Sequence, residues 1–530
     1  LNLILMKLKL KKEIGLSAIL FASVGGIIGS GWLFGSFHAA EASGTYSILA
    51  WIIGAFAMLL VALCYAELST MFPKSGALVH LSHLTHGKFL GRIWSWILFL
   101  AYVSIPPVEV IAVITYASKY VPELIQQNTG LLSTTGLIVS IAILAILVCI
   151  NFLAVKWVLR INSYITVWKI VIPLTTIVVL CIYAFQPENL NYASHGFSLA
   201  DALPTIATAG IAFSYIGFRN AIDLAGESSN PKKHIPIALV GSIMIAMLIY
   251  VGLQFAFIVS IPNGESINWA NLSFISVSAP LAVLSTLIGA TWWSLVLYAD
   301  AFVSPLGSSY ICVTTSSRIT MASGEIGYLP KFLADLNSYG APWKSLVITF
   351  LFGCIFFLPF PSWQQMISYV TSIIVLSFGL GPIILLILRN KLPERKRPFR
   401  LKWAVIIAPL AFFISNCIII WSGYEAISFM LKIILFFLVI YIIGNVISKT
   451  KFPKRKSWMK ILWLVPYFIG LFVISKYGPE MLGGNGMFEF WPTILWTLLL
   501  SIIILLYSIK SSQDIDEIKF AAKEIDELQV

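Results

Sequence analysis

Apolar residues recur along nearly the whole chain in runs of about 20, the length that a helix needs to cross the hydrocarbon core of a membrane. Polar residues gather in the short stretches between these runs, and no soluble domain fits among them. We therefore predict an all-α membrane protein with fourteen spanning helices. They lie at residues 15–37, 46–68, 90–119, 135–154, 161–185, 201–226, 236–261, 281–317, 343–360, 366–388, 404–424, 427–447, 461–476 and 489–509.

The first of these helices is interrupted by glycines. Residues 21–34 read FASVGGIIGSGWLF and include Gly25, Gly26, Gly29 and Gly31. Because hydrocarbon offers the backbone no hydrogen-bond partner, a break is tolerated only where it faces a cavity, a ligand or protein. Broken helices form the midplane substrate sites of many secondary transporters. The alternative is close packing of two helices, since Gly25 and Gly29 form a GxxxG pair.

A second break follows in the sixth helix. Residues 209–227 read AGIAFSYIGFRNAIDLAGE, in which Gly210 and Gly217 interrupt the apolar run and Asn220 and Asp223 follow. Broken helices at positions one and six are typical of transporters built from two inverted repeats of five helices. The pair of breaks therefore favours transport over simple packing.

Composition agrees with the membrane interpretation. Of the 530 residues, 59% are hydrophobic and 11% are charged, and the mean hydropathy is +0.91, whereas soluble proteins carry roughly 25% charged residues. The net charge is +12, but 30 of the 35 basic residues lie in alternate inter-helix segments. This positive-inside pattern puts both termini in the cytoplasm. The segments are 7–12, 74–92, 156–160, 232–233, 318–344, 389–402, 449–460 and 510–523.

The charge therefore faces lipid head groups, with residues 389–402 and 448–458 as anchors, and we expect no nucleic-acid partner. The six cysteines are scattered singly in apolar helices and indicate no disulfide or metal framework. His80, His83 and His86 have a spacing that could bring imidazoles together on one helix. They lie in a short loop without a nearby cysteine, so we expect no metal site and no cofactor.

Several motifs resemble the amino acid–polyamine–organocation permeases, in the expected order over residues 13–390. They are IIGSGWLF (27–34), YAEL (65–68), FSYIGFRNAIDLAGE (213–227), NPKKHIPIAL (230–239) and SRITMASGEIGYLPKF (317–332). The resemblance implies the LeuT-like 5+5 inverted-repeat fold. The segments QPENL (186–190), RPFRLKW (397–403) and WSGYEAISF (421–429) are most similar to the bacterial aspartate–proton symporter branch, which suits about four extra C-terminal transmembrane helices.

The resemblance also implies a division of the chain. Residues 1–13 form a cytoplasmic N-terminal tail and residues 14–390 the transport core of ten helices. Residues 391–510 carry the four additional helices, and residues 511–530 form a cytoplasmic tail that is helical or disordered.

At the first break, the resemblance implies that Ile27, Gly29, Ser30 and Gly31 line a substrate site, with Ser30 and Gly31 at the positions that bind the α-carboxylate. Unpaired N–H groups at the start of a half-helix carry partial positive charge and suit an anion. The Ser30 hydroxyl adds a donor. The alternative is that this hydroxyl bonds back to its own helix.

At the second break, Phe213, Tyr215 and Gly217 match positions that line the same cavity. An aromatic side chain there can close over substrate, and carbonyl groups near Gly217 can accept the α-ammonium group. The alternative is that Phe213 and Tyr215 simply pack in the core.

Arg219 departs from the family pattern. A guanidinium at this depth costs roughly 3 kcal/mol on insertion scales and needs a partner. Asp223, one turn further on, can supply a structural pair. The functional alternative is bidentate binding of an acidic substrate side chain, which favours aspartate or glutamate.

Proton coupling has two candidate residues. Lys169 matches a lysine that replaces sodium beside the first broken helix in some proton-coupled permeases, although it could instead snorkel to the membrane edge. Glu109 is an intramembrane acid that could relay protons or make a structural contact. We expect Asp300 to lie near the outer face, in a wet vestibule or at the interface, and Glu67 to pair with loop cations.

These residues predict a multi-pass transporter of the plasma membrane that imports an amino acid together with protons, with an acidic substrate. The alternative within transport is an amino acid exchanger (antiporter) for neutral or other amino acids. A transport-dead amino acid sensor and a membrane enzyme belong to other classes. The first usually adds a signalling domain and the second needs clustered catalytic groups, so we expect neither.

Overall fold

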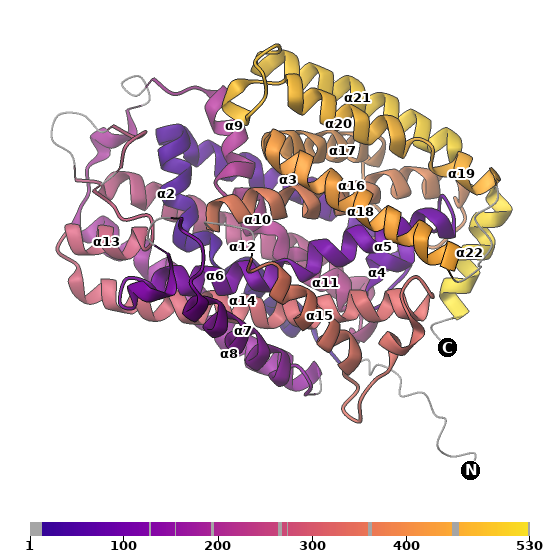
Figure 1. The fold of residues 1–530 in the computed structure, drawn as a ribbon, viewed down its shortest axis with the longest axis horizontal. Helices are drawn as coiled ribbons and strands as arrows, with labels where there is room; N and C mark the ends of the chain where they lie inside the picture. The colour runs from indigo at the N-terminus through magenta and orange to yellow at the C-terminus, as the bar shows by residue number, and fades with distance from the viewer. Residues whose placement is uncertain are drawn as a thin grey trace.

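The structure is a computed structural model that describes residues 13–126, 129–153, 155–191, 196–262, 268–272, 274–358, 363–447 and 455–527. Within these ranges the chain is helical, from α1 (Leu16–Ile27) to α22 (Ile515–Glu527) (Figure 1). Extended pairing in the described part is limited to two isolated β-bridges. The basic residues at 7–12 and at 449–454 lie outside the described residues.

Among the described residues, ten helices are long and apolar enough to cross a membrane, and the number is eleven when a bent pair counts as one span. Three shorter apolar helices, Leu16–Ile27, Thr134–Ile150 and Trp343–Ile355, accompany them. Every one of the fourteen predicted ranges coincides with a helix or a series of helices, so the all-helical membrane class is confirmed. Outside the two broken helices, the elements in these ranges include α3 (Ser47–Met71), α5 (Lys88–Val103), α6 (Ile105–Ala117), α7 (Thr134–Ile150), α8 (Val155–Tyr183), α12 (Pro231–Ser260), α14 (Thr291–Glu325), α15 (Trp343–Ile355), α16 (Trp363–Lys391), α17 (Ala404–Trp421), α18 (Tyr424–Ile447), α20 (Leu464–Tyr477) and α21 (Phe490–Ser511).

Both predicted helix breaks are present. In the first, α1 ends at Ile27 and α2 (Gly31–Ser43) begins after three residues that are not helical. In the second, α9 (Leu199–Thr208) gives way to α10 (Ile211–Tyr215) with a bend of 59° between the two halves. Gly210 lies at this bend with φ of 77°, a left-handed conformation that glycine adopts without steric cost.

Two predicted helices are each divided, which corrects their boundaries. The predicted helix 90–119 consists of α5 and α6, which meet at Ser104. Pro106 and Pro107 lack the N–H groups that would continue the helical hydrogen bonds, and the Tyr102 carbonyl instead accepts from the Ser316 hydroxyl at 2.8 Å. The predicted helix 281–317 consists of α13 (Pro280–Leu287) and α14, separated around Gly289, whose φ is 88°.

The two broken helices lie against each other in the core. The 3₁₀ segment η5 (Ile216–Arg219), which follows α10, packs on α1, and α2 contacts both α9 and α10. Around them, α1 also contacts α8, α12 and α14, so several helices approach the first break. The helices α20 and α21 run together along one side of the molecule, with α4 (Ala77–Ser82) and α22 at one end and α13 at the other (Figure 1).

Candidate functional site

A carboxylate of the chain lies at the start of the half-helix α2. The Ser30 backbone N–H donates to Glu109 Oε2 at 2.6 Å, and the Glu109 side chain is buried. A Cβ atom added to Gly29 would collide with the same carboxylate, so this glycine permits the close approach. Since a helix N-terminus attracts negative charge, Glu109 marks this position as one that an anion can take.

A cation lies on the other side of the first break. Lys169 Nζ donates to the Gly25 carbonyl at 2.5 Å, and the lysine side chain is fully buried. The alternative that Lys169 snorkels to the membrane edge is therefore wrong. Lys169 contacts the first broken helix, as the resemblance implied. Its role in proton coupling stays a prediction.

Side chains from other helices bond two more carbonyl groups, at the end of α1. Ser308 Oγ donates to the Gly26 carbonyl at 3.1 Å, and the Tyr250 hydroxyl donates to the Ile27 carbonyl at 2.9 Å. The carbonyl groups of Gly25, Gly26 and Ile27 are thus bonded by protein side chains, as a polar backbone inside a membrane requires. Neither Ser308 nor Tyr250 was predicted, because a serine or a tyrosine in an apolar helix carries no signal of its own.

The Ser30 hydroxyl does not bond back to its own helix. Its oxygen accepts a hydrogen bond from Trp363 Nε1 at 2.9 Å, across 333 positions of sequence. The indole ring also stacks on Phe34, with ring centroids 4.7 Å apart. Sequence reasoning missed Trp363, since an aromatic residue at the start of a spanning helix is typical of a membrane-interface anchor.

The second break meets the first through glycine. Gly217 lies against the backbone of Gly26 and Ile27, where an added Cβ would overlap main-chain atoms. Gly31 approaches the other half of the second break, since a Cβ there would collide with the Ser214 side chain. The two broken helices therefore pack closely through Gly26, Gly31 and Gly217, whereas the predicted pair faces other helices: Gly25 lies against α8 and Gly29 against Glu109.

The two aromatic residues of the second break are packed side chains. The Tyr215 hydroxyl donates to the Trp51 carbonyl at 3.2 Å, and the tyrosine is fully buried. Phe213 is also buried, with 4% of its side chain exposed. The packing alternative describes both residues in this structure, and a gating movement of Phe213 stays a prediction.

Arg219 is buried without an acceptor. Its side chain is fully buried, and in the part of the chain that the structure describes none of its three guanidinium nitrogens has a hydrogen-bond partner. The guanidinium carbon lies 3.5 Å from the centre of the Tyr102 ring, a geometry that gives a cation–π contact.

The predicted pair between Arg219 and Asp223 is not formed as a hydrogen bond. Asp223 Oδ2 instead accepts from the Tyr102 hydroxyl at 2.6 Å. Asp223 follows Arg219 by one turn of helix, but both side chains contact Tyr102 of α5 instead of each other. The Tyr102 hydroxyl binds the carboxylate, and the face of its ring contacts the guanidinium. The guanidinium of Arg219 therefore lies against the Tyr102 ring, with the Cys312 thiol of α14 near it.

Asp300 is fully buried, so the expected wet vestibule is wrong. Its Oδ1 accepts from Trp168 Nε1 at 2.7 Å and from the Ser304 hydroxyl at 2.9 Å. The bond from Trp168 joins α14 to α8, next to Lys169 in the sequence. Counting residues along α14 could estimate its depth but not its neighbour on α8.

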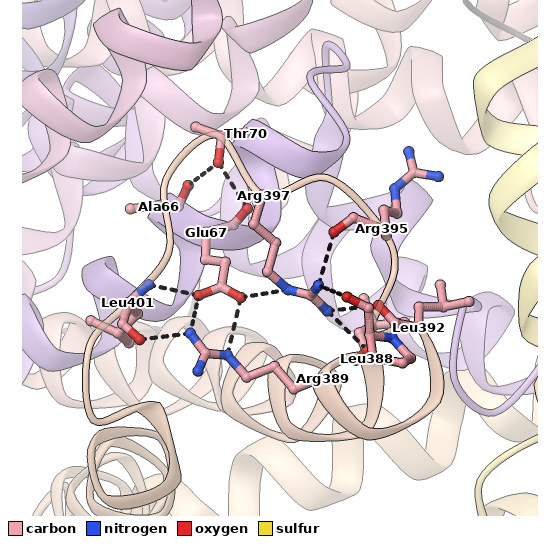
Figure 2. A network of polar contacts seen from close by, with 10 residues as sticks. Ala66, Glu67, Thr70, Leu388, Arg389, Leu392, Arg395, Arg397 and Leu401 are labelled. Carbon is pink, nitrogen blue, oxygen red and sulfur yellow. Dashed lines mark hydrogen bonds and ion pairs between the residues drawn. The ribbon is translucent and has the colours of Figure 1, made fainter.

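The C-terminal end of α3 carries an ion network, and Glu67 pairs there with loop cations as predicted. This carboxylate lies between Arg389 and Arg397, with N–O distances of 2.5 and 3.1 Å, and also accepts from the Leu401 backbone N–H at 2.8 Å (Figure 2). A second buried pair joins Glu227 to Arg318 of α14 at 2.9 Å. Both pairs lie beyond the breaks, on the side of α4 and α22.

The three histidines of residues 80–86 point to different partners. His86 Nε2 lies 2.9 Å from the Ser508 carbonyl, and the His83 ring packs on Tyr328. Burial lowers the pKa of His80 to about 3 and the pKa values of His83 and His86 to about 4. Among the described residues, no group of three or more histidine, cysteine, aspartate or glutamate side chains could hold a metal ion.

Comparison with known proteins gives the context of this site. The family described as amino acid permease matches residues 14–424. The glutamate/serine transporter AimA of Bacillus subtilis is 34% identical over 528 residues, which cover 98% of this chain and 97% of that protein. The aspartate-proton symporter of Bacillus subtilis is 32% identical over 475 residues, 88% of this chain and 90% of that protein. The mouse (Mus musculus) Asc-type amino acid transporter 1 is 26% identical over 426 residues, 77% and 76% of the two chains.

Proposed function

We propose, from the premise that this chain belongs to the amino acid permease family and is an amino acid transporter, that it imports an acidic amino acid together with a proton. Membership of this family implies the LeuT fold. The fourteen-span count, the inverted repeat in residues 14–390, the four extra helices in 391–510 and the cytoplasmic position of both termini are parts of this proposal.

The observation that carries the proposal is the contact between Ser30 and Glu109. The Ser30 N–H and the Gly31 N–H begin α2 and suit the α-carboxylate of an amino acid, but Glu109 holds the first of them at 2.6 Å. Two carboxylates cannot share one donor at the start of a half-helix without strong repulsion. A proton taken up by Glu109 weakens its hold and admits the substrate, so substrate and proton bind together.

Lys169 completes this arrangement. Its ammonium group donates to the Gly25 carbonyl on the α1 side of the break, while Glu109 bonds the α2 side. The two buried charges thus hold the two halves of one broken helix. When Glu109 becomes neutral, Lys169 loses its nearby counter-charge. The protonation of Lys169 and its hydrogen bond to the Gly25 carbonyl then depend on whether substrate is bound. We propose this as the coupling of proton movement to rearrangement of α1.

Arg219 supplies the preference for an acidic side chain. A buried guanidinium without an acceptor gains two charge-assisted hydrogen bonds when a carboxylate reaches it. Phe213, Tyr215 and Gly217 line the same space in this proposal, with Ile27 and Gly29 opposite. The names of two relatives above 30% identity, a glutamate/serine transporter and an aspartate-proton symporter, support the same substrate class.

The proposal is tested by uptake of labelled glutamate into proteoliposomes that contain the purified protein. Uptake should follow an inward proton gradient in sodium-free buffer and should be inhibited by unlabelled aspartate more than by leucine or arginine. Uptake that requires sodium, or that leucine inhibits better than aspartate does, would contradict the proposal.

A further inference from the structure

Trp363, the first residue of α16, contacts both broken helices. Its indole N–H donates to Ser30 Oγ at 2.9 Å in the first break. The far edge of the ring lies beside Gly210 in the second break, where an added Cβ would come within 3.1 Å of the ring. Gly210 therefore provides both the left-handed bend and the space that the indole occupies.

The indole also lies along the half-helix α2. It stacks on Phe34, with an interplanar angle of 26°, and lies nearly parallel to His38, with ring centroids 6.1 Å apart. Phe34 and His38 follow Ser30 by one and two turns. Only 3% of the Trp363 side chain is exposed, so the ring fills the space between α2 and the start of α10.

This position is directly outward of the proposed carboxylate site. The half-helix α2 contacts α13, which lies at one end of the molecule (Figure 1). A ligand that reached Ser30 from that end, between the two half-helices, would meet the indole first. Entry of the ligand would then require Trp363 to break its contacts with the two broken helices and to form them again afterwards.

We infer that Trp363 is the outer lid of the substrate site and a positioning residue for Ser30. This inference rests on the proposed function, which makes that end the extracellular one. The indole closes the path between α2 and α10, and its N–H holds the Ser30 hydroxyl by the oxygen. The proton of that hydroxyl, which faces Glu109 in the structure, can then donate to the carboxylate of an incoming amino acid that takes the place of Glu109.

Two variants distinguish the role of Trp363 as a lid from its role in positioning Ser30. Trp363→Phe keeps a ring against Phe34 but loses the N–H. A neutral hydrogen bond contributes about 0.5–1.5 kcal/mol, so the KM for glutamate should rise roughly two- to twelvefold while kcat is unchanged. Trp363→Ala also removes the ring, so kcat should fall as well because the outer side no longer closes.

Trp293→Phe is the matched control. Trp293 is also a buried indole, and its N–H also donates to a hydroxyl, Thr176 Oγ1 at 3.1 Å. It lies on α14, and its hydroxyl partner is on α8. A purely structural role for tryptophan would give the two Trp→Phe variants similar losses of thermal stability and no specific change in KM.

Closure of the site by Trp363 can be measured by the rate of thiol labelling, an assay that does not depend on transport. In a background without the six native cysteines, Ser30→Cys is treated from the outside of right-side-out vesicles with a membrane-impermeant methanethiosulfonate. Labelling should be slow with Trp363 present and with Trp363→Phe, and at least tenfold faster with Trp363→Ala. The Trp293→Phe background should label as slowly as the parent.

The lid is overturned if Trp363→Ala labels no faster than the parent, and the positioning role is overturned if Trp363→Phe leaves KM unchanged. Failure of the proposed function looks different. In that case the unmodified protein takes up no glutamate, while the labelling contrast between Trp363 and Trp363→Ala persists.

Discussion

Replacing Arg219 with glutamine separates a substrate-binding cation from a structural one. If the guanidinium binds the side-chain carboxylate of the substrate, its removal breaks a buried charge pair in the bound state. Truncating one partner of such a pair costs about 2–5 kcal/mol, so the KM for glutamate should rise at least roughly 30-fold. Serine has no second carboxylate, so Arg219→Gln should not weaken its ability to compete.

The effect on stability has the opposite sense from that of a structural ion pair. The guanidinium has no acceptor among the described residues and gains its contact from the Tyr102 ring. That cation–π contact contributes about 2 kcal/mol when desolvated, against a burial cost of roughly 3 kcal/mol. The two terms nearly cancel, so the free energy of unfolding of Arg219→Gln should stay within about 1 kcal/mol of the parent.

The assay combines inhibition of labelled glutamate uptake with thermal unfolding in detergent. Arg219→Lys is the matched control, because it keeps the charge but loses the planar bidentate geometry. If Arg219→Gln keeps its preference for acidic amino acids and loses about 3–5 kcal/mol of stability, the guanidinium and Asp223 form a buried structural pair. The proposed role of Arg219 would then be refuted.

Three further predictions concern other parts of the molecule. Gly31→Val should abolish amino acid binding in a scintillation proximity assay while the protein remains folded, because the added side chain meets Ser214; normal transport by this variant would show that the site is misplaced. Lys169→Ala should stop or uncouple uptake, because the Gly25 carbonyl loses its buried donor; uptake equal to that of the parent under a proton gradient would contradict this role. The buried neutral histidines should make the protein less stable as the pH falls below about 6.5, because the unfolded chain takes up protons that the folded chain, with pKa values of about 3 to 4, excludes. The loss should be about 1.4 kcal/mol per pH unit for each histidine, and His83→Asn should reduce the pH dependence of thermal unfolding by roughly a third; an unchanged slope would show that His83 does not contribute.

The sequence predicted what depends on local order along one helix. The glycines of residues 25–31 and 210–217 marked both breaks, because a glycine cluster in a membrane helix has few explanations. The inner position of Glu67 predicted its cationic partners. The prolines at 106 and 107 also carried a signal for the division of α5 from α6, although the long apolar run outweighed it.

What the sequence did not predict depends on which faces of distant helices meet. Trp363 and Ser30 are 333 positions apart, and no periodicity joins them. Asp300 was placed by counting along its own helix, which says nothing of Trp168 on α8. For Arg219, the spacing to Asp223 suggested an ion pair, but Tyr102 from another helix contacts both residues. Its hydroxyl binds Asp223, and its ring contacts the Arg219 guanidinium. The packing of distant helices decides which side chains meet, and spacing along one helix does not predict it.

The most direct measurement of proton-coupled import is the proton flux that accompanies substrate entry. Proteoliposomes with no ion gradient and no internal amino acid are suspended in weakly buffered, sodium-free medium, and glutamate is added while the external pH is recorded. Symport predicts that the medium becomes more alkaline as glutamate enters, and that Glu109→Gln abolishes the pH change. Entry of labelled glutamate without any pH change, or entry only when the vesicles are preloaded with amino acid, would contradict symport and indicate uniport or exchange.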